Sequence, residues 1–241
     1  MDELLTHVLN AHGGVDNWSK VQTVTAKVRL GGPFWGARGW SGVYDDQTVT
    51  LDAHREHITF SPFPGAGLTS VFDVDPEVVR IQAADGRVIE RRERPEARSP
   101  RSPTKSDGTR RRSLTSRARR RGTTSRRRSC SPTPVEARGI EPWLEDGQTW
   151  RRLAVRFPRG NANHNPDQTF YDEDFLQRRM DYSPEVTGAP PVAHYTHDPK
   201  TLDGFVFYTR RLVRLHDADG VADQRFACIT IDLDSVAVDR S

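Results

Sequence analysis

The chain has 241 residues, 34% of them hydrophobic and 29% charged, with a formal net charge of +3 and two cysteines. This length allows one large domain or two small ones, and two cysteines exclude the disulfide framework of small secreted domains. Because no window approaches about 18 apolar residues and the N-terminus lacks a basic and then apolar leader, we expect no transmembrane helix, no signal peptide and a cytoplasmic protein.

The predicted elements begin with one helix. Leucine and valine recur at helical spacing near the N-terminus, and Gly13-Gly14 follows as a stop signal. This pattern predicts an amphipathic helix over residues 2–12.

From Val21 onward the hydrophobic period changes to two, which is typical of strands. A run rich in β-branched residues predicts a strand over residues 21–30, ending at Gly31-Gly32-Pro33. Similar runs predict strands over 34–43, 47–53, 56–61, 68–73, 77–83, 87–92, 150–157, 168–171, 176–182, 192–196, 204–215 and 225–238.

Between these two groups of strands lies an Arg/Ser-rich segment. Residues 98–134 hold twelve arginines, one lysine and one acid, Asp107, so they carry +12 and leave −9 for the rest of the +3 chain. One interpretation is a disordered basic arm that binds phosphate backbones. The acidic remainder argues against a nucleic-acid-binding face elsewhere on the protein.

The second interpretation of this segment is a local frame shift in the coding sequence. In the displaced frame, TCN serine codons become Phe, Leu, Ile or Val, and CGN arginine codons become small residues or proline. Residues 121–134 can then be reread as an aromatic-rich amphipathic stretch. This interpretation also explains why charge and composition change together at the boundaries of the segment.

About a dozen evenly spaced strands with one N-terminal helix predict a mostly antiparallel α+β fold. We expect a large curved sheet or a half-open β-barrel. Residues 1–241 would form a single domain, interrupted by residues 97–134, which we expect to be irregular or disordered.

The sequence contains few patterns that indicate catalysis. The His-x-x-His spacings at His54/His57 and His194/His197 can bind zinc on a helix, but in strands residues i and i+3 point to opposite faces. No Gly-rich phosphate loop opens a helix, and no nucleophile-elbow pattern is present. We therefore expect no metal, no cofactor and no catalytic residue.

Aromatic residues recur on the predicted strands with other residues between them. They either fill a core or, on a large sheet with few helices, line a pocket for an apolar ligand. The candidate ligand-binding residues are Trp35, Trp40, Phe60, Phe170, Tyr182, His194, Tyr195, Phe205 and Phe207.

Several short pieces of the chain carry a family resemblance. They are Ala11-His12-Gly13-Gly14 with Trp18, Gln168-Thr169-Phe170-Tyr171, Arg179-Met180-Asp181-Tyr182, Ala193-His194-Tyr195 and the run from Asp203 to Arg211. Outside residues 97–134, the chain resembles a group of bacterial proteins related to the lipoprotein-carrier (LolA-like) superfamily. The resemblance implies a half-open barrel closed by helices, with an apolar cavity for acyl chains.

Two departures from that group matter. The group has an aromatic, apolar segment where this chain has its arginines, and the absent signal peptide argues against periplasmic lipoprotein carriage. A smaller one is Tyr208, which stands where the group has proline.

Three functions remain open from the sequence. The leading hypothesis is non-catalytic binding of a hydrophobic small molecule or lipid, with His194 or Tyr195 orienting a polar head group. The second is an enzyme of secondary metabolism that acts by shape and positioning, since an enzyme of the violacein pathway resembles the same superfamily. The third is nucleic-acid binding through residues 98–134. The sequence does not indicate the oligomeric state.

Overall fold

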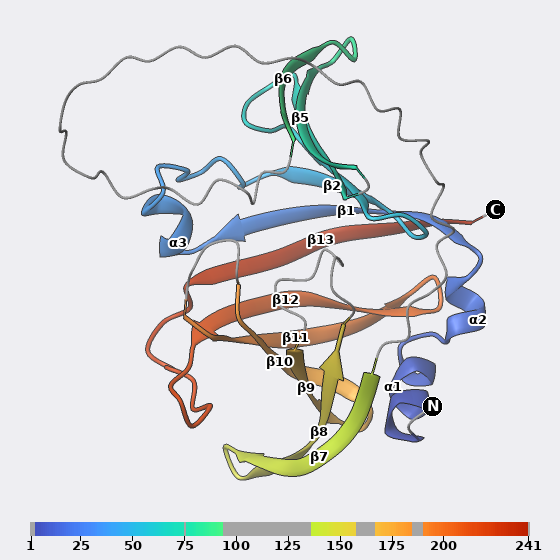
Figure 1. Cartoon of the computed structure of the whole chain (residues 1–241), viewed down its shortest axis with the longest axis vertical. Coiled ribbons are helices and arrows are strands. Elements are labelled where there is room, and N and C mark those ends of the chain that lie inside the picture. Colours follow the sequence, from blue (N-terminus) through green and yellow to red (C-terminus); the bar gives the residue numbers. More distant parts are fainter. Residues whose placement is uncertain (1–2, 75, 94–135, 158–166, 185–189, 241) are drawn as a thin grey trace, which may run out of the picture.

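A computed structural model describes residues 3–74, 76–93, 136–157, 167–184 and 190–240. The Arg/Ser-rich segment, with both of its interpretations, lies outside the described residues. The described chain forms one curved, open sheet of thirteen antiparallel strands with three short helices beside it (Figure 1). The predicted fold class is confirmed.

The helices all lie near the N-terminus. The first, α1 (Glu3–Ala11), agrees with the helix predicted over residues 2–12 and is followed by α2 (Val15–Trp18) and α3 (Pro33–Gly36). Among the described residues, no helix has the length and apolar character needed to cross a membrane.

The strands follow one another along the sheet as hairpins, except at its centre. Their bounds are β1 (Val21–Gly31), β2 (Gln47–Asp52), β3 (His57–Ser61), β4 (Leu68–Val74), β5 (Glu77–Ala83), β6 (Val88–Glu93), β7 (Glu136–Glu145), β8 (Gln148–Arg156), β9 (Asp167–Glu173), β10 (Leu176–Tyr182), β11 (Val192–Leu202), β12 (Phe205–Leu215) and β13 (Ile229–Arg240). The spatial order is β6-β5-β4-β3-β2-β1-β13-β12-β11-β10-β9-β8-β7. The first and last strands of the chain therefore pair at the middle, and β6 and β7 form the two edges.

The prediction of a strand over residues 34–43 was wrong. Pro33 begins the short helix α3, and two glycines with positive φ, Gly39 and Gly42, turn the chain after it. The aromatic residues of this stretch pack on one another instead of joining the sheet: Trp40 stacks on Phe63 with ring centroids 5.4 Å apart. The whole aromatic cluster comprises Phe34, Trp35, Trp40, Tyr44 and Phe63.

The structure contains one strand that was not predicted and one that is longer than predicted. The edge strand β7 was not predicted, because Gly139 and Pro142 interrupt its alternation and most of its side chains are exposed. Strand β11 continues past Thr196 to Leu202, including a polar stretch that pairs with the first half of β12.

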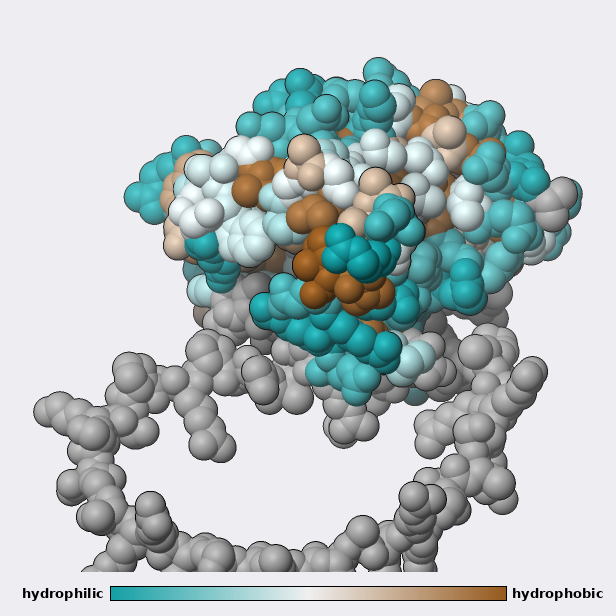
Figure 2. Space-filling model, turned by 90° about the horizontal axis from the view of Figure 1, so that it is seen from above, coloured by the Kyte–Doolittle hydropathy of each residue, from teal (hydrophilic) through white to brown (hydrophobic). Residues whose placement is uncertain are grey.

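Polar residues cover most of the surface at the end of the molecule formed by β5 and β6, where the apolar residues gather mainly in one patch (Figure 2). On β6, Val88 and Ile89 are 45% and 52% exposed. The charged side chains of β6 pair along the strand, as Arg92 does with Glu90, and charges on an edge strand disfavour edge-to-edge association.

Candidate functional site

One face of the sheet, here called the apolar face, is made of rows of apolar side chains that stand opposite one another across the strands. Residues paired in register on antiparallel strands share a face, so the rows can be followed from strand to strand. From β5 to β13, the first row is Val79, Phe72, Ile58, Leu51, Val24 and Val238. The second is Ile81, Ser70, Phe60, Val49, Ala26 and Val236.

The apolar face continues across the other half of the sheet. From β13 to β8, a third row consists of Ile229, Val213, His194, Met180, Phe170 and Leu153. A register shift joins the halves: Lys27 pairs with Ser235, but the next residue, Val28, pairs with Leu233. This extra residue in β13 turns Leu233 and Val236 to the same side despite their odd spacing.

The opposite side of the same strands, here called the polar face, is hydroxylated and charged in the first half of the sheet. Thr25 and Thr50 pair across β1 and β2 and share a hydrogen bond of 3.1 Å, and Thr59 extends this row on β3. Nearby, Asp73 accepts a hydrogen bond from His57 at 2.6 Å and forms an ion pair with Arg80. In this half of the sheet, alternation thus separates an apolar from a polar face, because successive side chains of a strand point to opposite sides.

Much of the apolar face is only half-buried by the described residues. In the first row, Val24 is buried at 5% exposure, whereas Leu51, Ile58 and Phe72 remain partly exposed. A cavity of about 530 Å³ is lined by these last three side chains together with the β2–β3 turn. Phe205 and Phe207 pack with Val24 and Leu51 in the core cluster beside this cavity.

The helix α1 also lines cavities of its own. Leu5 lines a cavity of about 710 Å³ together with Val155, Gln168 and Tyr182 at the ends of β8 to β10. Leu9, one turn later, lines another of about 370 Å³ together with Trp18, Phe205 and Phe207.

The connection after α1 is fixed to the sheet by polar and close backbone contacts. His12 Nε2 lies 2.8 Å from the hydroxyl of Tyr208, and Trp18 meets Phe205 edge-on at 5.5 Å. Gly13 has a φ of +117°, and a Cβ there would lie 2.5 Å from the carbonyl oxygen of Gly204. Only glycine fits this approach of the chain to β12.

The structure brings most of the predicted ligand-binding residues to the apolar face, but not all. Phe60, Phe170 and His194 stand in its rows, Tyr182 lines the cavity next to α1, and Phe205 and Phe207 join the core cluster of that face. The other three lie elsewhere: Trp35 and Trp40 belong to the aromatic cluster after β1, and Tyr195 points to the polar face.

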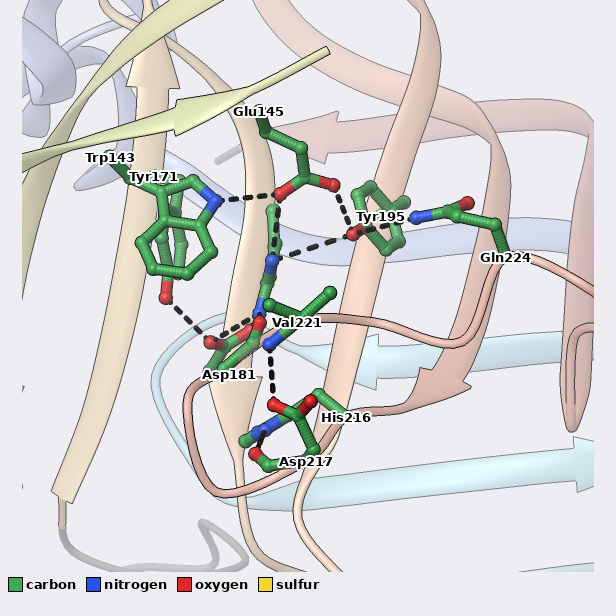
Figure 3. Close-up of polar contacts among 11 residues, drawn as sticks. Trp143, Glu145, Tyr171, Asp181, Tyr195, His216, Asp217, Val221 and Gln224 are labelled. Carbon is green, nitrogen blue, oxygen red and sulfur yellow. Dashed lines mark hydrogen bonds and ion pairs between the residues drawn. The ribbon is translucent and has the colours of Figure 1, made fainter.

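Tyr195 belongs to a buried polar network centred on Arg179. Figure 3 labels Glu145, Asp181, Tyr171 and Tyr195 of this network. The Arg179 side chain is fully buried and forms two hydrogen bonds to Asp181, at 2.6 and 2.8 Å. It also donates to a Glu145 oxygen at 2.7 Å and to the carbonyl of Gly220 at 2.5 Å. Its guanidinium lies over the ring of Tyr171, 4.7 Å from the centroid, which adds a cation–π contact.

The two carboxylates of the network are satisfied by neighbouring side chains. Asp181 accepts the hydroxyl of Tyr171 at 2.6 Å, and Glu145 accepts Trp143 Nε1 at 2.8 Å and the hydroxyl of Tyr195. Burial alone would lower the pKa of Arg179, but hydrogen bonding and the charge of Asp181 outweigh it and raise that pKa. The arrangement therefore holds the charged guanidinium of Arg179 between two carboxylates.

Sequence reasoning missed this network. Arg179 and Asp181 alternate within a predicted strand, so their common face could have been read from the spacing. Glu145 could not have been found, because it lies on the unpredicted strand β7 and meets Arg179 only through the fold.

The His194/His197 pair divides between the faces, as the alternation of a strand predicts, whereas His54 lies in the β2–β3 turn and only His57 is on a strand. His194 stands in the third apolar row, whereas His197 stacks on Tyr195 on the polar face, with centroids 6.4 Å apart. Burial lowers the pKa of His197 below its ordinary value. Within the described ranges, no three His, Cys, Asp or Glu residues gather in a way that could hold a metal ion.

Neither a protein-family model nor a curated protein sequence matches the chain. Solved structures do. A Vibrio parahaemolyticus domain assigned to the outer membrane lipoprotein-sorting proteins superposes with a TM-score of 0.52 at 9% identity, covering 98% of this chain and 91% of that one. A LolA superfamily protein from Nitrosomonas europaea gives a TM-score of 0.50 at 9% identity, covering 97% and 93%.

The fold is LolA-like. Since the similarity extends over nearly the whole length of both solved chains, it concerns the complete LolA-like sheet and not one hairpin motif. At 9% identity it establishes architecture alone, so the function has to be argued from the two faces of the sheet.

Proposed function

We propose that this protein binds a hydrophobic small molecule or a lipid chain on its apolar face. The observation that carries the proposal is the pair of apolar rows that cross six strands from β5 to β13 while several of their side chains stay half-buried. Large apolar patches of this kind usually mark ligand or partner sites. The LolA-like fold and the lipoprotein-sorting assignment of one structural neighbour are in keeping with it.

The energetics are adequate for a chain-like ligand. Each buried methylene contributes about 0.8 kcal/mol, so a twelve-carbon chain offers about 9 kcal/mol before the losses of association. The cavities of about 530 and 370 Å³ both border the Phe205 cluster, the first through Leu51 and the second through Phe205 and Phe207, so such a chain would meet apolar side chains in both. Binding of this kind needs shape and apolar surface, and few polar groups.

Neighbouring residues of β3 provide a matched test. Ile58 lines the cavity of about 530 Å³, whereas Thr59 points to the polar face, and both are half-buried. We expect I58D to weaken binding of the uncharged dye N-phenyl-1-naphthylamine and of 1-dodecanol by about tenfold or more, because a carboxylate would then face the apolar ligand. T59D should leave both affinities within about twofold.

Dye fluorescence, displacement by 1-dodecanol and circular dichroism of all three proteins would make the comparison. Equal affinities for I58D and the unsubstituted chain, with both folded, would refute the proposed face. So would the absence of any saturable dye or dodecanol binding to the unsubstituted protein.

A further inference from the structure

Arg211 is a cation on the apolar face that forms no ion pair with any residue the structure describes. On β12 it stands in register with Thr196 of β11 and Ile231 of β13. It lies two residues before Val213, so it leaves the sheet on the side of the third apolar row. Its Nε is buried and has no hydrogen-bond partner, and no carboxylate in the described part of the chain pairs with its guanidinium.

The titratable groups nearest to Arg211 do not neutralise it. They are Tyr182 and Tyr208, whose own burial raises the pKa of each to about 12, so both phenols are uncharged at neutral pH. Burial lowers the pKa of Arg211, yet a guanidinium stays protonated in proteins. Its positive charge therefore lacks a carboxylate partner among the described residues at a site where burial penalises a charge, which is unfavourable for the free protein.

The same sheet shows how a buried arginine is satisfied when its role is structural. Arg179 has two carboxylates, a backbone carbonyl and an aromatic ring around it. Arg211 has two neutral phenols nearby and, among the described residues, no acid paired with it. The contrast points to an anion that the described part of the chain does not supply.

We propose that Arg211 holds the anionic group, a carboxylate or a phosphate, of an amphiphilic ligand whose apolar chain lies along the apolar face. This deepens the proposed function and rests on it. The head group would lie at the Tyr182 side of the cavity of about 710 Å³ beside α1, since Tyr182 lines that cavity and interacts electrostatically with Arg211. A charge-assisted hydrogen bond to a guanidinium is stronger than a neutral one and would select acids over alcohols.

The test compares ligands with the same chain and different head groups. Displacement of N-phenyl-1-naphthylamine from the full chain is measured with 1-dodecanol, dodecanoate, dodecyl phosphate and chain-free inorganic phosphate. We expect at least one of the two anionic ligands to bind about tenfold to a hundredfold more tightly than the alcohol. R211M should abolish this preference and leave the affinity for dodecanol unchanged or improved. R210M is the matched control, because Arg210 is exposed on the polar face of the same strand, and it should retain the preference.

Thermal unfolding without ligand gives a second readout. Because R211M removes an unpaired buried charge, its melting temperature should equal or exceed that of the unsubstituted chain. A marked fall in melting temperature would mean that Arg211 is structural and would overturn the proposal. Dodecanol binding without preference for either anion would also overturn it while leaving the proposed function intact. Displacement of the dye by inorganic phosphate but by none of the alkyl-chain ligands would overturn it as well. If no ligand with an alkyl chain binds, both the role of Arg211 and the proposed function are refuted.

Discussion

Arg179 and Asp181 meet in a two-point ion pair, with Nε 2.6 Å from one carboxylate oxygen and an Nη 2.8 Å from the other. They are two residues apart on β10 and therefore share the polar face. Glu145 reaches the same guanidinium from the sheet-edge strand β7. The network thus connects the edge strand β7 to β10 on the side of the sheet opposite the apolar face.

Removing the cation of this network should be costly. In R179M, Asp181 and Glu145 would remain mostly buried without their counter-ion, so we expect the free energy of unfolding to fall by about 3–5 kcal/mol. Urea unfolding monitored by tryptophan fluorescence measures this. R156M is the control: the Arg156–Asp167 pair is 63% and 62% exposed, and its loss should cost less than about 1 kcal/mol. Similar losses for both variants would contradict the structural role assigned to Arg179.

All five tyrosines should resist ionisation in the folded protein. Burial is the largest cause that raises the pKa of each, to about 12 for Tyr182 and Tyr208. The set is Tyr44, Tyr171, Tyr182, Tyr195 and Tyr208. Absorbance at 295 nm should therefore show little tyrosinate at pH 10, where about half of the phenols of an unfolded chain are ionised.

The same shifts set the alkaline limit of stability. The unfolded chain releases its phenolic protons near pH 10, before the folded chain does, so the unfolded state binds fewer protons above that pH. The stabilisation is complete below pH 10 and is lost progressively as the pH rises toward 12. Y182F should lose less stability across this interval than the unsubstituted chain. An unfolding free energy that does not change between pH 9 and 11.5 would contradict these assignments.

Gly13 should be nearly irreplaceable. In G13A the new methyl would meet both the backbone of Gly204 and the ring of Phe205 at 2.5 Å, in addition to the strain of a positive φ. We expect a loss of about 2–4 kcal/mol, with detachment of α1 from the sheet. G39A separates the two effects, since its φ is +76° but nothing lies within 4 Å. It should cost only about 1 kcal/mol. Equal losses in thermal melts would show that the close approach to β12 is unimportant.

The sequence was most informative where alternation is strict. The alternation of Ile58 with Thr59, and of Val24 with Thr25, indicates strands with one apolar and one polar side, and the structure keeps both. The pattern failed at residues 34–43, because an aromatic run that packs on itself has the same composition as a strand. It also failed at β7, where side chains at a sheet edge need not be apolar.

What no local pattern could supply is which distant segments meet. Tyr195 alternates with His194 and Thr196 as any strand residue would, and only the fold brings Glu145 to its hydroxyl. The uncompensated charge of Arg211 is likewise invisible in the sequence, because it depends on which side chains are absent around it. Alternation therefore predicted which residues share the apolar face, but it did not predict the contacts of Tyr195 or the missing partner of Arg211.

The pairing of β1 with β13 has a consequence for biogenesis. Residues 21–93 and 136–240 contribute separate groups of adjoining strands, and the two groups meet along the ladder between β1 and β13, from Val21 and Arg240 to Gly31 and Thr230. During translation, one edge of β1 therefore stays unpaired until β13 has left the ribosome. A nascent chain stalled before β13 would expose two unpaired strand edges, one on β1 and one on β12, and we expect chaperones to bind it.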